Sequence, residues 1–69
     1  MDKQKFVDVL KKAGYSSAVI EDNKPTVTFV GVDKATLKRA YINIGLIAKK
    51  VGYKHSWGVK NLEEEHAGQ

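Results

Sequence analysis

Few side chains in this 69-residue chain are of the types that perform catalysis. There is no cysteine, so a zinc site would depend on His55, His66 and carboxylates. His55 and Ser56 are adjacent, but in a strand they point to opposite faces and do not form a base and nucleophile pair. The run of glutamates that begins at Glu63 lies near the chain end, where solvated carboxylates are poor general acids. We therefore expect no enzymatic activity, no cofactor and no metal.

The chain is basic, and its charge is unevenly distributed. Residues 1–60 contain all twelve basic side chains, whereas residues 61–69 contain three glutamates and no lysine or arginine. A basic surface attracts polyanions and speeds their encounter, although net charge alone does not define a site. The pattern predicts one small domain over residues 1–60 and an acidic, flexible tail over residues 61–69.

A near-repeat indicates how two helices end. "KKAGY" occupies residues 11–15 and "KKVGY" occupies residues 49–53. Gly14 and Gly52 suit the left-handed position after a helix, lysines before them complement the helix dipole, and the tyrosines can fold back. The first helix follows Asp2 as its N-cap, with an expected apolar face of Phe6, Val9, Leu10 and Ala13.

Between the two helices, the pattern predicts a β-hairpin. "SSAVI" and "TVTFVG" alternate, and "EDNKP" between them provides turn residues. Ala18 and Ile20 share one face, as do Val27 and Phe29. Asp33 then caps a long helix, for which we expect a core-facing stripe of Leu37, Ala40, Tyr41, Ile44, Ile47, Ala48 and Val51.

The segment after the second cap allows two interpretations. As a strand, residues 54–60 place His55, Trp57 and Val59 on one face and complete a three-stranded sheet. Alternatively, "IAKKVGYKHSWGVKNL" (residues 47–62) resembles a helix-turn-helix, because Ala48 and Gly52 have the spacing of that family's helix-to-turn junction. The resemblance implies a recognition helix that presents to DNA Lys54, His55, Ser56, Trp57 and Lys60. We favour the strand, since Gly58 falls where the family has an inward aliphatic residue.

These elements predict the α+β class, in the order α-β-β-α-β. We expect a three-stranded sheet with both helices packed on one face, and a last strand that lies parallel to the second, beside it. The longest apolar run, "YINIGLIA" at residues 41–48, is too short to cross a bilayer, and the N-terminus lacks a signal-peptide core. We therefore expect a cytoplasmic protein with no membrane partner.

The long helix provides the main functional hypothesis. At about 100° per residue, its cations lie opposite the core stripe, and Ile42 and Leu46 lie among them. We expect a small non-catalytic module that binds nucleic acid through Lys38, Arg39, Lys49, Lys50, Lys54 and Lys60. The alternative is a protein-binding inhibitor or adaptor, or a homodimer, that uses Ile42 and Leu46 as anchors with a lysine rim. The size and charge of the chain are typical of phage or mobile-element accessory proteins.

Overall fold

The N-cap and C-cap residues of the sequence divide the chain into two helices and three strands. The computed structural model describes residues 1–63 and contains α1 (Lys3–Lys12), β1 (Val19–Glu21), β2 (Lys24–Val30), α2 (Lys34–Val51) and β3 (Gly58–Leu62). β2 is the central strand, paired antiparallel with β1 and parallel with β3. The expected α+β class, element order and parallel last strand are confirmed. Of the predicted acidic tail, the structure describes residues 61–63, and residues 64–69 lie outside the described residues.

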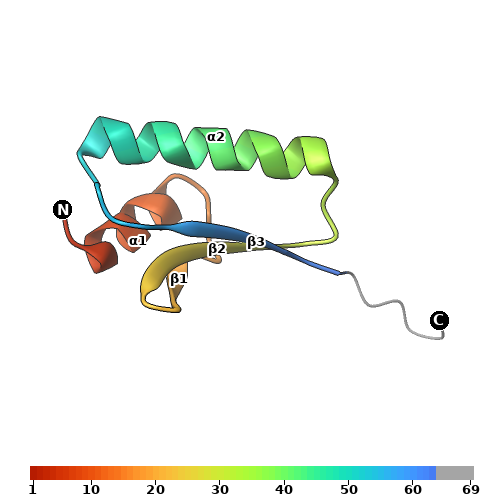
Figure 1. The fold of residues 1–69 in the computed structure, drawn as a ribbon, viewed down its shortest axis with the longest axis horizontal. Coiled ribbons are helices and arrows are strands. Elements are labelled where there is room, and N and C mark those ends of the chain that lie inside the picture. Colours follow the sequence, from red (N-terminus) through yellow and green to blue (C-terminus); the bar gives the residue numbers. More distant parts are fainter. Residues whose placement is uncertain (64–69) are drawn as a thin grey trace.

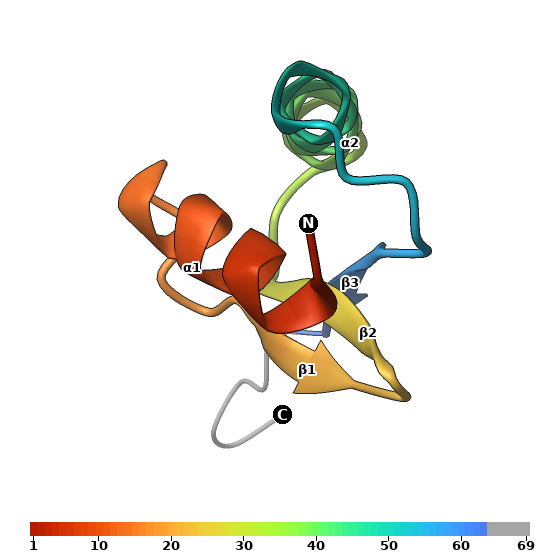
Figure 2. The same ribbon diagram turned by 90° about the vertical axis from the view of Figure 1, so that its left-hand side faces the viewer.

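Both helices pack on the same face of the sheet (Figures 1 and 2). The cross-strand register pairs Val27 with Val59 on that face, and Ala18, just before β1, is buried in the same core. These side chains join a core to which α1 contributes Phe6 and Leu10 and α2 contributes its inner side. The opposite face of the sheet carries no described helix, so the fold has two layers.

The hairpin turn is made by Asp22 and Asn23, whose φ angles are 52° and 63°. Two consecutive residues with positive φ form the type I′ turn that matches the twist of the flanking strands. Pro25, expected within the turn, lies instead in β2, buried and paired with Ile20. The pairing of β2 with β3 begins only at Thr26, so a proline at position 25 can be accommodated near the start of the central strand.

The near-repeat forms two helix C-terminal caps, as predicted. Gly14 has φ 105° and Gly52 has φ 78°. The backbone N–H of Tyr15 donates to the carbonyl of Leu10 at 2.9 Å, and that of Tyr53 donates to Ala48 at 2.9 Å. These are the bonds of the Schellman motif, which closes a helix by turning the chain back over its last turn. At the N-termini, Asp2 accepts from the amide of Lys5.

The two tyrosines of the near-repeat connect the helices to each other. Tyr15 follows α1, and its hydroxyl accepts a hydrogen bond of 2.7 Å from Asn43 on α2. Tyr53 follows α2, and its ring stacks on Phe6 of α1, with 4.2 Å between centroids. Burial raises the pKa of the Tyr53 hydroxyl, which donates to the carbonyl of Ser56 at 2.6 Å. Each helix end is thus attached to the other helix.

Three expectations about helix faces are wrong in detail. α1 buries Val7 with Phe6 and Leu10, whereas Ala13 is exposed and Val9 is only half-buried. The predicted and the observed buried residues both have helical spacing, so either set could form the buried face of α1. Contact with the sheet decides between them, and it buries the face that includes Val7. On α2, Ala40, Ile44 and Ala48 are buried as expected. Tyr41, expected in the core stripe, is 56% exposed and lies beside Trp57 at the margin of the core.

The segment after α2 also differs from both sequence interpretations. The strand begins at Gly58, not at residue 54, and it continues through Leu62. Residues 58–62 form no recognition helix, so the resemblance to a helix-turn-helix is wrong. Residues 53–57 form a loop, which the hydrogen bond from Tyr53 to Ser56 holds in place. Trp57 therefore lies before the strand, half-buried, with its ring against Gly45.

We predict that Gly14→Ala and Gly52→Ala each lower the free energy of unfolding by about 1 kcal/mol, because an L-residue is strained at positive φ. An added Cβ would meet no atom within 4 Å at either glycine, so the effect isolates the backbone. Gly45→Ala is the matched control, since its Cβ would lie 3.6 Å from the Trp57 ring, an ordinary contact. In urea melts, the free energy of unfolding of the Gly45→Ala variant should be unchanged or increased. Equal effects at all three glycines would contradict the two-cap interpretation.

Candidate binding surface

α2 has one side packed on the core and one side that no other described element covers (Figure 1). We call this second side the outer face of α2. It consists of seven exposed residues, Ala35, Lys38, Arg39, Ile42, Leu46, Lys49 and Lys50. From Ala35 to Lys50 the rise of about 1.5 Å per residue gives this face a length of about 22 Å.

An apolar row runs along the middle of the outer face. Ile42 is 53% exposed and Leu46 is 61% exposed, one helical turn apart. Ala35 extends the row, because it lies within about 40° of both on the helix circumference. The sequence also allows that the first helix or the C-terminal tail covers Ile42 and Leu46. α1 does not cover them, since both side chains are exposed and α1 lies on the side of α2 that faces the sheet, whereas residues 64–69 of the tail lie outside the described residues. Aliphatic side chains of this size exposed side by side are typical of contact surfaces.

Cations lie on both sides of this row. Lys38 and Lys49 follow one side, and Arg39 and Lys50 follow the other. No acidic residue occurs from Lys34 to Val51. Among residues 1–63, none of these four cations takes part in an ion pair. Lys54 is exposed in the loop just beyond the end of α2. The outer face is therefore apolar at its centre and positive along both margins.

Lys60, predicted to belong to the same basic surface, lies elsewhere. It pairs in register with Thr28 and projects from the uncovered face of the sheet. There it forms an ion pair with Glu21, and the hydrogen bond that its ammonium group donates to this carboxylate raises the pKa of Lys60. The structure thus brings together five of the six predicted basic residues in α2 and the loop after it, and it separates Lys60 from them.

The uncovered face of the sheet lacks the features of a base-stacking platform. Thr26 is buried, and its hydroxyl donates to the carbonyl of Lys24, while the Ser17 hydroxyl bonds the backbone N–H and carbonyl of Thr28. Val19, Val30 and Leu62 are exposed on it, but no aromatic ring is. Single-stranded nucleic acid binders stack bases on such rings. The described strands therefore offer no such platform on this face.

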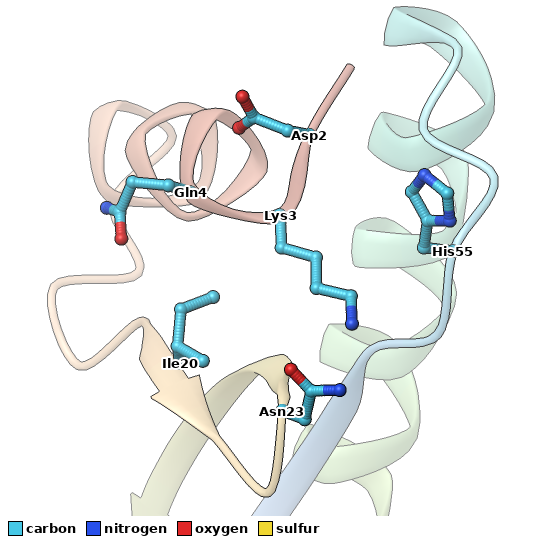
Figure 3. Close-up of a pocket in the computed structure, with 6 residues that line it drawn as sticks. All are labelled: Asp2, Lys3, Gln4, Ile20, Asn23 and His55. Carbon is cyan, nitrogen blue, oxygen red and sulfur yellow. The ribbon is translucent and has the colours of Figure 1, made fainter.

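A shallow hollow of about 510 Å³ lies between the start of α1, the hairpin turn and the loop after α2 (Figure 3). His55 contributes to it, and its ring lies edge-on to Tyr53 at 5.5 Å between centroids. The lining residues are Asp2, Lys3, Gln4, Ile20, Asn23 and His55. Asp2 is engaged as the N-cap of α1. Within residues 1–63, no three His, Asp or Glu side chains gather in a way that would hold a metal ion.

Comparisons with protein-family models, curated proteins and solved structures find no match. In the described part of the chain, no helix has the length and apolar character needed to cross a membrane. The helix wheel identified the cations and the two aliphatic residues of the outer face. Ala35 was missed, because alanine carries no functional signal by itself.

We predict that Ile42→Asp and Leu46→Asp each leave the free energy of unfolding within about 0.5 kcal/mol of the parent chain, since both side chains are mostly in water. Ile44→Asp is the matched control, because Ile44 is fully buried and an unpaired carboxylate in the core should abolish folding. Circular dichroism in a urea series measures all three. A large loss of stability in the first two variants would mean that the outer face is part of the core.

Proposed function

We propose that the protein is a non-catalytic module that binds another protein through the outer face of α2. The observation that carries this proposal is the exposure of Ile42 and Leu46 at the centre of a cationic frame. Protein interfaces have this organisation, with an apolar centre that is desolvated and a polar rim that remains in contact with water.

The charges indicate the character of the partner. Lys38, Arg39, Lys49 and Lys50 form a rim that takes part in no ion pair among the described residues, so a partner with an acidic rim would complement it. Complementary charges of this kind increase the association rate and help to exclude partners of the wrong charge. We therefore place an acidic protein surface, with an apolar centre of its own, first among the partners.

Nucleic acid is the second candidate, and the absence of any acid along α2 favours it. The four cations of the outer face, with Lys54 beside them, could contact the phosphate backbone. Phosphate contacts would leave Ile42 and Leu46 unused and partly exposed. A protein partner would use both the cations and the two aliphatic residues of the outer face, so we prefer it to nucleic acid.

We predict that a photo-crosslinking amino acid in place of Leu46 captures a protein from nuclease-treated extract of the source cells. The same group in place of Lys12 is the matched control, because Lys12 is exposed on α1, away from the outer face. Adding Arg39→Glu to the Leu46 probe should reduce the captured band, since the rim contributes to binding. Equal capture from both positions, or capture that occurs only in extract not treated with nuclease, would contradict the proposal.

The second candidate has its own test, a titration of labelled duplex DNA at several salt concentrations. If nucleic acid is the partner, contact with roughly 3 to 4 phosphates gives a slope of log affinity against log salt of about −3. Lys38→Glu with Arg39→Glu should then flatten this slope. Lys5→Glu with Lys12→Glu changes the net charge equally on α1 and is the control. A slope near zero, or the same loss in both double variants, would exclude a DNA site on the outer face.

A further inference from the structure

We infer that the segment which binds the outer face of α2 is an acidic amphipathic α-helix. This inference rests on the proposed function and specifies the kind of partner. It follows from the spacing of the outer-face residues, from the internal hydrogen bonding of the α2 backbone and from the distribution of charge on α2.

The outer face has the residue spacing of a two-helix seam. Ala35, Arg39, Ile42, Leu46 and Lys49 follow one another at intervals of 4, 3, 4 and 3 residues. At about 100° per residue they fall within an arc of about 80°. Alternating intervals of three and four are those of the a and d positions through which two helices pack along their length. Ala35, Ile42 and Leu46 supply apolar contacts at these positions.

An extended segment suits this surface less well than a helix. The peptide groups in the interior of α2 are bonded within the helix, so its outer face offers no free backbone donors or acceptors to an incoming strand. A strand laid on Ile42 and Leu46 would lose water from its own peptide groups without replacement bonds. A helical partner satisfies its peptide groups internally and presents only side chains.

The cations within the seam determine the sign of the partner's charge. Of the four cations beside the apolar row, Arg39 and Lys49 lie nearest to it, and they continue its spacing before Ile42 and after Leu46. A facing helix must therefore place carboxylates opposite both of them and aliphatic side chains between. Lys38 and Lys50 flank the seam and favour further acids at the margins of the partner. The matching helix is apolar along one stripe and acidic around it.

A second copy of this chain does not meet these requirements. In an antiparallel pair with Ile42 opposite Leu46, Arg39 of one copy would face Lys49 of the other. In a parallel pair in register, Arg39 would face Arg39. No acid on α2 offsets this repulsion in either arrangement. The charges of α2 thus oppose a pair of α2 helices and favour an acidic helix.

A designed peptide tests the inference. The probe is a labelled, end-capped peptide of about 20 residues, long enough for an isolated helix. It carries leucines opposite Ile42 and Leu46 and glutamates opposite Arg39 and Lys49. Two matched peptides replace either the leucines by serine or the glutamates by lysine. Fluorescence anisotropy with the full chain measures affinity, and circular dichroism measures the helix gained on binding.

We expect the acidic amphipathic peptide to bind and to gain helix, and both matched peptides to bind at least tenfold more weakly. Leu46→Asp should weaken binding at least tenfold, whereas Lys12→Glu on α1 should not. Arg39→Glu should transfer preference toward a peptide with lysine at the facing position, which a purely structural effect would not do.

Several results would overturn the inference. One is equal binding of the serine peptide, because charge alone would then suffice. Another is a concentration-dependent dimer in sedimentation that Leu46→Asp abolishes, because the occupant would then be a second copy. Specific crosslinking at position 46 without peptide binding would reject the helical partner and leave the proposed function standing. Absence of both crosslinking and peptide binding would reject the inference and the proposed function together. If a DNA slope of about −3 accompanied that result, the outer face would be assigned to nucleic acid.

Discussion

The stacking of Tyr53 on Phe6 is the contact on which the placement of α2 depends. Both rings are buried, and they lie 4.2 Å apart at the junction of the two helices. α2 itself buries mainly small side chains, Ala40 and Ala48, around Ile44. Small residues let the helix approach the core closely but bury little apolar area. The aromatic stack therefore fixes the end of α2 against α1, and with it the direction in which the outer face points.

Local features of this fold were predictable from the sequence because their causes are local. A glycine after two lysines ends each helix whatever surrounds it, and an aspartate begins each helix by accepting one backbone amide. The hydrogen bonds from Thr36 hold the pKa of the capping Asp33 below its usual value. The contacts of Tyr15 and Tyr53 were not predictable, because nearly identical local sequences lead to different partners, Asn43 and Phe6.

The wrong expectations share a physical origin in contacts between distant segments. The position of β3 depends on its register with β2, which pairs Val27 with Val59 and leaves residues 53–57 to cross from α2 to the sheet. Nothing in the sequence separated Lys60 from the other lysines of the basic surface, because its ion pair with Glu21 depends on how the strands are arranged. In contrast, the cations and aliphatic residues of α2 share one face because of helical geometry alone, so the wheel located them without knowledge of the sheet.

The outer face is difficult to explain by the needs of folding. A domain of this size buries only about 60% of the surface of its unfolded chain, so each apolar residue left in water is a lost contribution to the core. Lysine or glutamine in place of Ile42 or Leu46 would suit an exposed helical position at least as well. Lys49 and Lys50 complement the dipole at the end of α2, but the apolar row between the cations brings no gain to the isolated fold. It becomes favourable when an acidic, partly apolar surface covers α2.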